Sequence, residues 1–324
     1  MQDKYGRQIE YMRVSITDRC DLRCRYCMPE GCDKVSMKQI LRYEEIIRIC
    51  GAAAELGITR LKITGGEPFA RLGCIDLIGK LKAIDGIEEV TVTTNGQIVS
   101  GYMDQLAEIG LDGINISLDS LDADRFRYIT GGGELAKTLA SIDAAVRCGI
   151  KTKINCLIQK GFNEDELMDI AGLAFEKGID VRFIEMMPIG VGDASRGLSN
   201  DAALAQLKER WQDLQPDDRR RGNGPAVYYS RQGVDGSIGF ISAIHGKFCS
   251  SCNRVRLTSQ GVLKQCLCYD SGVDIRPALS GTDEELRKAL RDAIYDKPKE
   301  HCFDKEYQAG EEITEHHLMS QIGG

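Results

Sequence analysis

Residues 13–27 read Arg13-Val-Ser-Ile-Thr-Asp-Arg-Cys20-Asp-Leu-Arg-Cys24-Arg-Tyr-Cys27. The first five are rich in β-branched side chains, which predicts a strand that ends just before a group of cysteines. Similar β-rich runs recur over the first two thirds of the chain. They are Ile58–Thr64, Glu89–Thr94, Gly113–Leu118, Lys151–Ile158 and Val181–Met187.

Helical patterns separate these runs. Apolar residues recur at helical spacing in Tyr43–Leu56 and, more briefly, in four later segments. These segments are about Asp76–Ile84, Met103–Ile109, Leu135–Cys148 and Glu164–Glu176. Strands that alternate with helices predict parallel strands joined by right-handed crossovers. A full eightfold barrel takes about 250 residues. Because the repeat fades near Leu214, we expect an α/β fold, an incomplete (βα)6 TIM-type barrel.

The sequence pattern changes after this repeat. A polar connection spans Asp217–Pro225. From Ala226 there follow short β-like segments, a cysteine-rich loop and a charged helix near Asp283–Ile294. We therefore expect a barrel domain over residues 1–216 and a small C-terminal domain over residues 217–324 that closes the open side of the barrel.

The composition is that of a globular protein, with 324 residues, 42% hydrophobic and 28% charged. A formal charge of −7 argues against nucleic-acid binding, which needs a basic surface. No apolar run approaches the roughly 20 residues that span a bilayer, and the start of the chain lacks the apolar core of a signal peptide. We therefore expect a cytoplasmic protein with no membrane contact. In that setting, the 13 cysteines indicate metal ligation rather than disulfides.

The first cysteine triad is Cys20-x3-Cys24-x2-Cys27, directly after the first strand. Loops at strand ends build the active site in barrels of this kind. Three thiolates can hold three irons of a [4Fe–4S] cluster and leave the fourth iron open to a small ligand. Buried structural cysteines, or a zinc site completed by Cys32, are the alternatives.

With an aromatic residue before its third cysteine, the first triad resembles the signature of radical S-adenosylmethionine (SAM) enzymes. The resemblance implies that the open iron binds SAM and that one electron cleaves SAM to a 5′-deoxyadenosyl radical. Gly65-Gly-Glu-Pro68 resembles the GGEP element of that family, which holds the ammonium group of SAM. The SAM contacts that the resemblance implies are Tyr26, Gly66, Glu67, Ser117 and Met187.

The second cysteine triad is Cys249-x2-Cys252-x13-Cys266. Its spacing also suits structural zinc, with Cys268 as a fourth ligand. Arg254 and Arg256 lie between its second and third cysteines and alternate, so on an extended segment both point to one side. Two guanidinium groups beside an open iron favour an anionic ligand and a second [4Fe–4S] cluster.

The sequence from Phe248 to Leu257, with Cys266 downstream, resembles the GTP 3′,8-cyclase family of molybdenum cofactor biosynthesis. So do Asp18–Pro29, Arg182–Met187 and the terminal Gly323-Gly324 pair, whose counterpart in the family reaches into the active site. The resemblance implies two [4Fe–4S] clusters, with the guanine of GTP at the second. The implied GTP contacts are Arg13, Lys62, Thr93, Lys153, Arg182, Arg254 and Arg256.

The implied reaction is that of a lyase. The deoxyadenosyl radical removes hydrogen from C3′ of GTP, and C3′ then bonds to C8 of guanine, which yields (8S)-3′,8-cyclo-7,8-dihydroguanosine 5′-triphosphate. The implied partners are a flavodoxin or ferredoxin as electron donor, cyclic pyranopterin monophosphate synthase as the next enzyme, and a second copy in a homodimer. The alternatives are another radical SAM enzyme with an auxiliary cluster, such as a peptide maturase, and a non-enzymatic iron–sulfur or zinc protein.

Overall fold

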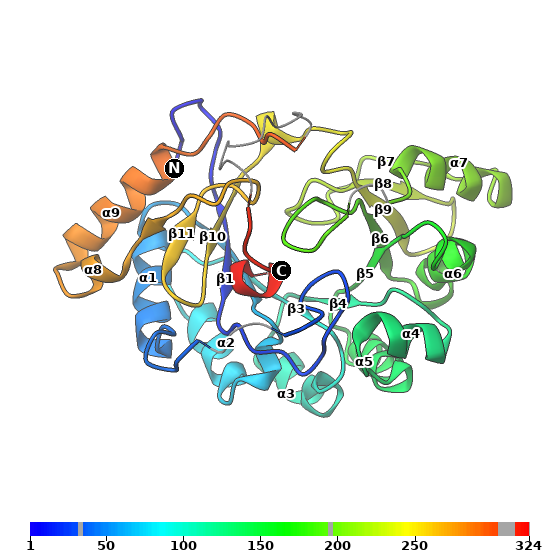
Figure 1. Ribbon diagram of the computed structural model, residues 1–324, viewed down its shortest axis with the longest axis horizontal. Helices are drawn as coiled ribbons and strands as arrows, with labels where there is room; N and C mark the ends of the chain where they lie inside the picture. Colours follow the sequence, from blue (N-terminus) through cyan, green and yellow to red (C-terminus); the bar gives the residue numbers. More distant parts are fainter. Residues whose placement is uncertain (32–34, 194–196, 304–314, 324) are drawn as a thin grey trace.

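The computed structural model describes residues 1–31, 35–193, 197–303 and 315–323. Within these ranges one curved sheet has the strand order β12-β11-β10-β1-β2-β3-β4-β5-β6-β9-β8-β7 (Figure 1). The strands are β1 Tyr11–Ser15, β2 Arg60–Thr64, β3 Glu89–Thr94, β4 Gly113–Ser117, β5 Thr152–Leu157, β6 Asp180–Ile184, β7 Gln215–Asp217, β8 Val227–Ser230, β9 Ser237–Ile241, β10 Arg254–Leu257, β11 Val262–Lys264 and β12 Val273–Asp274. The helices are α1 Tyr43–Glu55, α2 Cys74–Lys82, α3 Met103–Glu108, α4 Ala123–Thr130, α5 Leu135–Arg147, α6 Leu167–Lys177, α7 Asn200–Arg210, α8 Arg276–Leu279, α9 Asp283–Tyr295 and α10 Met319–Ile322.

Strands β1 to β6 run parallel, and the helices that connect them cover the outer face of the sheet (Figure 1). Side chains alternate between the two faces of a strand. In β1, Met12 and Val14 are fully buried in the apolar core. Arg13, between them, instead lines the inner face. Burial of the outer face fixes the register, so the inner face is free to carry polar side chains.

The predicted α/β partial barrel is confirmed. Each of the six β-rich runs overlaps a strand, although β1 and β6 begin earlier than predicted, at Tyr11 and Asp180, and the predicted charged helix is α9. The sequence patterns missed α4 and α7. Helix α4 is only eight residues long, and α7 buries only Ala203 and Leu207 among its apolar residues, which leaves little helical periodicity to detect.

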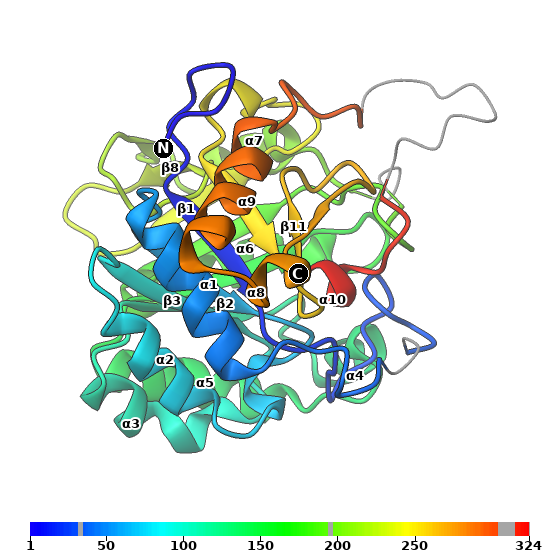
Figure 2. The same cartoon turned by 90° about the vertical axis from the view of Figure 1, so that its left-hand side faces the viewer.

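The C-terminal part of the chain continues the barrel sheet at both edges. Strand β9 pairs in parallel with β6, and β10 pairs in parallel with β1. Helix α9 lies against α1 on the outside (Figure 2). The division at residues 216 and 217 stays a prediction, since the sheet is continuous across it. None of the helices in the described ranges is long and apolar enough to cross a bilayer.

Candidate active site

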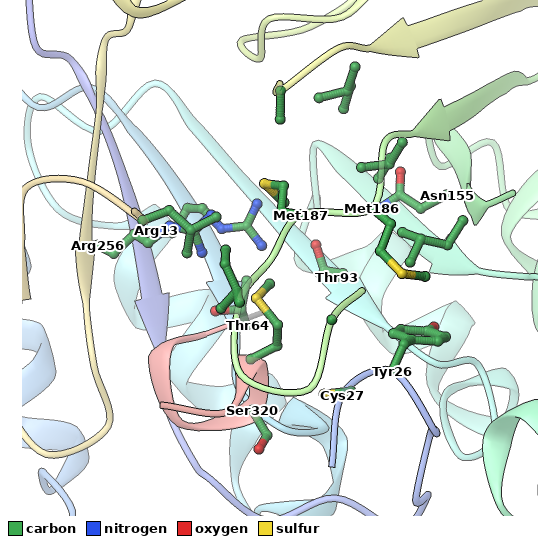
Figure 3. A pocket seen from close by; sticks show the side chains of 18 of the residues that line it. Arg13, Tyr26, Cys27, Thr64, Thr93, Asn155, Met186, Met187, Arg256 and Ser320 are labelled. Carbon is green, nitrogen blue, oxygen red and sulfur yellow. The ribbon is translucent and has the colours of Figure 1, made fainter. Parts of the chain in front are cut away.

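Both cysteine triads line one cavity of about 330 Å³ on the inner face of the sheet. Residues from the ends of β1 to β6 and from the loops after β9 and β11 form its wall. Figure 3 shows Arg13 and Arg256 on one side of this cavity and Tyr26 with Cys27 on another. The structure therefore brings together two motifs that are more than 200 residues apart in the sequence.

The loop of the first triad is held on two sides. The backbone N–H groups of Cys27 and Met28 donate to the carbonyl oxygen of Cys24, at 3.0 and 2.9 Å, which folds the loop into a turn. The N–H groups of Arg23 and Arg25 donate to carbonyl oxygens at the end of α4, both at 2.9 Å. Helix α4, which the sequence did not predict, thus supports the cysteine loop.

Gly66 lies against the backbone just before Cys20. A Cβ atom at this position would be 2.4 Å from the carbonyl oxygen of Arg19, so only glycine permits the contact. The N–H of Gly66 donates to Thr17 O and that of Glu67 to Arg19 O, both at 2.8 Å. Gly66, one of the predicted SAM contacts, lines the cavity and also fixes where the first triad begins.

Glu67 is fully buried behind the cavity wall. Its carboxylate accepts hydrogen bonds from Thr94 Oγ1 at 2.7 Å and from the N–H of Asn95 at 2.8 Å. Burial raises the pKa of Glu67 to about 7. Glu67 is not among the residues that line the cavity, so in this conformation it braces the loops around the first triad.

Tyr26, Ser117 and Met187, the other predicted SAM contacts, all line the cavity. The hydroxyl of Tyr26 donates to Asp119 Oδ2 at 2.6 Å. Burial raises the pKa of Asp119 to about 6. Sequence reasoning missed Asp119, although it ends the same Asn-Ile-Ser-Leu-Asp run as Ser117 and, like other residues at strand ends, was a candidate by position.

The loop of the second triad is braced from the N-terminus of the chain. Arg7 is buried and donates to the carbonyl oxygens of Cys249 at 2.9 Å and Lys299 at 2.8 Å. Burial raises the pKa of Cys249. At Cys252 burial acts in the same direction, but the nearby cations Arg254 and Lys297 outweigh it and lower the pKa to about 7.

Neither triad has the spacing of a mononuclear metal site. Among the described residues, only Asp270, Glu315 and His317 bring three potential ligand atoms within 4.8 Å of one another. Tetrahedral zinc, with Zn–S near 2.3 Å, would draw its sulfurs to about 3.8 Å apart. Cys268 instead lies 3.0 Å, sulfur to sulfur, from Cys302. The cysteines of each triad are not gathered to that mutual distance and all line the cavity, which leaves room for a larger iron–sulfur cluster. Cys32, the other proposed zinc ligand, is outside the described residues.

A row of cations crosses the sheet beside the second triad. Arg13 on β1 is the register partner of Arg256 on β10 and of Lys62 on β2. Arg254, the register partner of Tyr11, lies two positions before Arg256 on the same face of the strand. Because β10 pairs with β1, its two alternating arginines lie on the inner face of the barrel.

The predicted GTP contacts fall into two connected pockets. Arg13, Thr93, Arg254 and Arg256 line the main cavity. Lys62, Lys153 and Arg182 do not. They line a smaller adjoining pocket of about 90 Å³, which Arg13 and Arg254 also border.

The cations of the smaller pocket differ in their partners. Lys153 forms an ion pair with Asp180 at 2.6 Å, and Arg182 donates to Asn155 Oδ1 at 2.6 Å. Lys62 is 7% exposed, and burial together with Arg182 and Arg13 lowers its pKa well below the usual value. None of the described carboxylates forms an ion pair with it within 4 Å.

The C-terminal tail enters the same cavity. Arg256 Nη1 donates to the carbonyl oxygen of Gly323 at 2.5 Å. Gly323 has φ +79°, and a Cβ atom there would be 2.9 Å from Thr64 Oγ1. The position therefore requires glycine both for its backbone conformation and for space. Gly324 is outside the described residues.

Comparison with known proteins agrees with this geometry. The Radical SAM superfamily model matches residues 14–174, and the Molybdenum Cofactor Synthesis C model matches residues 179–303. GTP 3′,8-cyclase of Clostridium perfringens (strain SM101 / Type A) is 42% identical over 327 residues, covering 100% of both chains. That of Alkaliphilus oremlandii is 43% identical, also with full coverage. The chain belongs to the GTP 3′,8-cyclase family.

Solved structures show the same fold in more distant proteins. Streptococcus suis SuiB bound to S-adenosylmethionine has a TM-score of 0.65 at 16% identity, covering 90% of this chain and 66% of that one. The anSMEcpe structure with bound AdoMet has a TM-score of 0.58 at 16% identity, covering 88% and 82%. Membership of the GTP 3′,8-cyclase family confirms the predicted radical SAM enzyme and its cofactors, SAM and iron–sulfur clusters.

Proposed function

We propose that this protein converts GTP to (8S)-3′,8-cyclo-7,8-dihydroguanosine 5′-triphosphate, the first step of molybdenum cofactor biosynthesis. One observation carries the proposal: both cysteine triads and the arginines of β1 and β10 line a single cavity. A radical source and a nucleotide site must share one enclosed space for a hydrogen atom to pass between them.

The donor sets fit two clusters. Each triad offers three thiols to the cavity at more than single-ion spacing, which leaves one iron of a [4Fe–4S] cluster without a protein ligand. Cys20, Cys24 and Cys27 would hold the first cluster, and Cys249, Cys252 and Cys266 the second. When bound, the first cluster and SAM supply the radical that abstracts hydrogen from C3′ of GTP, and the second cluster supplies an iron for the guanine.

The chain itself supplies the triphosphate site. Arg13, Arg254 and Arg256 border the main cavity, and Lys62, Lys153 and Arg182 extend the positive charge into the smaller pocket. Burying a cation without a counter-charge is costly. A triphosphate would offset that cost for several cations at once through charge-assisted hydrogen bonds.

Apolar residues complete the cavity. Leu157, Ile184, Met186 and Ile189 contribute to its wall beside the predicted SAM contact Met187. A dry wall protects a carbon radical from side reactions with water. The tail residues Met319 and Ser320 also line the cavity, so the tail helps to separate it from solvent.

Further parts of the proposal concern partners and organisation. We infer a flavodoxin or ferredoxin as electron donor, a homodimer, and cyclic pyranopterin monophosphate synthase as the enzyme that uses the product. The protein would act in the cytoplasm, where its thiols stay reduced. Residues 1–216 would carry the radical chemistry, and residues 217–324 the second cluster and the paired arginines.

Anaerobic incubation of the reconstituted protein with SAM, GTP and dithionite tests the function. Mass spectrometry should find 5′-deoxyadenosine together with an isomer of GTP, and metal analysis should find about eight irons per chain. With SAM and dithionite but no GTP, the isomer should be absent. Formation of 5′-deoxyadenosine without any change in GTP would instead favour a different substrate, such as a peptide.

A further inference from the structure

Lys297 is a buried cation that no sequence motif marks. It directly follows Asp296, the C-terminal cap of α9, and its N–H donates to Ile294 O at 3.2 Å. The side chain is 2% exposed. Its ammonium donates to the carbonyl oxygen of Gln265, the residue before Cys266. The short segment after α9 therefore places a positive charge within the loop of the second triad.

The surroundings of Lys297 include all three cysteines of that triad. Lys297, Cys249, Cys252 and Cys266 line the same cavity. The hydrogen bond to Gln265 O holds the ammonium one residue from Cys266, on the wall that Cys249 and Cys252 share. In the described ranges none of the carboxylates forms an ion pair with it within 4 Å. A buried ammonium needs a counter-charge, and thiolates of this triad on the same cavity wall would supply one.

The two triads differ in the sign of the charges around them. Beside the first triad lie two carboxylates: Asp21 follows Cys20 directly, and Asp119 accepts a hydrogen bond from Tyr26, which precedes Cys27. Beside the second triad lie two cations: Arg254, two residues after Cys252, and Lys297 both line the cavity with its cysteines. These charges come from separate loops, so the two triads differ in their charged neighbours and not in their cysteines.

We propose that the buried ammonium of Lys297 raises the reduction potential of the second cluster. The inference rests on the proposed function for the presence of a [4Fe–4S] cluster at Cys249, Cys252 and Cys266.

The direction follows from charge. A cluster on three thiolates is already negative, and reduction from [4Fe–4S]2+ to [4Fe–4S]1+ adds one electron from an external reductant without making or breaking a bond. A fixed cation stabilises the more negative state, and does so strongly where water is excluded. In the proposed reaction a higher potential would favour the reduced form of the cluster beside the nucleotide.

The test uses the full-length chain with Cys20→Ala, Cys24→Ala and Cys27→Ala, which retains only the second triad. The reconstituted protein is titrated with dithionite in the absence of SAM and GTP, and the reduced cluster is followed by electron paramagnetic resonance. Lys297→Met removes the charge but keeps the length of the side chain. We expect its ratio of reduced to oxidised cluster at a fixed potential to fall at least tenfold, about 59 mV for one electron.

Two controls separate this effect from general damage. Lys297→Arg keeps the charge and should restore the ratio to within about threefold of the parent, which is less than half of that shift. Lys299→Met makes the same change of charge at an exposed side chain two residues away and should leave the ratio unchanged. About four irons per chain should remain in all three variants.

The inference is overturned if Lys297→Met retains its iron and its potential, or if both Lys297 variants lose iron, because the side chain would then serve only the fold. Failure of the proposed function looks different. A wild-type chain with about eight irons that leaves GTP unchanged would reject the cyclase reaction while the potential of the second cluster still depended on Lys297.

Discussion

Arg13 on β1 and Arg256 on β10 are register partners on neighbouring parallel strands, and both line the main cavity (Figure 3). Like charges directly opposite each other on one face of a sheet are destabilising. Burial lowers the pKa of Arg13 to about 10 and also lowers that of Arg256 well below its usual value. The fold thus holds an unfavourable pair that a polyanionic ligand would stabilise.

Arg256→Gln should therefore weaken GTP binding with little change in the stability of the ligand-free chain, because relief of the repulsion from Arg13 offsets the lost hydrogen bond to Gly323 O. A charge-assisted hydrogen bond to phosphate contributes about 1.5–3 kcal/mol, so Kd should rise roughly 10- to 100-fold. Isothermal titration calorimetry measures the affinity, and thermal unfolding measures the Tm of the ligand-free protein. Arg127→Gln, at an exposed side chain on α4, is the matched control. An affinity within twofold of wild type would remove Arg256 from the triphosphate site.

The two triads should fail in different ways when single cysteines are replaced. Cys24→Ala should abolish formation of 5′-deoxyadenosine, because the first cluster would lose a ligand. Cys252→Ala should still cleave SAM but form no GTP isomer. Each variant should lose about four of eight irons. Mass spectrometry and iron analysis on the same preparations check both statements, and cyclised GTP from Cys252→Ala would contradict the division of labour.

The local sequence predicted the parallel strands and both triads because each depends on short-range spacing. The pairing of β10 with β1 could not be predicted, since more than 200 residues separate the two strands and no periodicity encodes their contact. The family resemblance put Arg13 at the same GTP site as Arg254 and Arg256, but their register across neighbouring strands was not predictable. Lys297 was missed because a single lysine after a charged helix is typical of a solvated surface.

Gly66→Ala should disrupt the first triad. Its Cβ atom would lie 2.4 Å from the carbonyl oxygen of Arg19, so the loop that leads into Cys20 must move. We expect loss of about four irons per chain and a lower Tm. Gly79→Ala is the control: it lies within α2 with no atom within 4 Å of the new Cβ, and should stabilise the chain by about 0.5–1 kcal/mol. Equal iron content in the two variants would show that the contact at Gly66 is dispensable.

Glu67 should make the stability of the metal-free chain depend on pH. Burial raises its pKa from 4.5 in the unfolded chain to about 7 in the folded one. Between these values the folded state holds a proton that the unfolded state lacks, so stability falls as pH rises through this window. The free energy of unfolding of wild type, relative to Glu67→Gln, should increase as pH is lowered from 7 to 4.5. Urea titrations at several pH values measure it, and a constant difference would mean that Glu67 is already ionised throughout the window.

A buried ion pair holds the C-terminal tail in the cavity. Lys264 on β11 forms an ion pair with Glu315, and their side chains are 3% and 0% exposed. The N–H of Glu315 also donates to Cys268 O at 2.8 Å. Removing one partner of a buried pair leaves the other charge uncompensated, at a cost of about 3–5 kcal/mol. The tail can avoid that cost by leaving its site, which would also withdraw Gly323 from Arg256.

Glu315→Gln should therefore raise amide hydrogen exchange over residues 315–323, read by mass spectrometry of the C-terminal peptide. The double variant Lys264→Met/Glu315→Leu removes both charges together and should recover most of the protection, because no buried charge is then left unpaired. Asp292→Asn breaks an exposed pair with Lys288 on α9 and should change stability by less than about 0.5 kcal/mol. If Glu315→Gln exchanged no faster than wild type, backbone contacts and apolar packing alone would hold the tail.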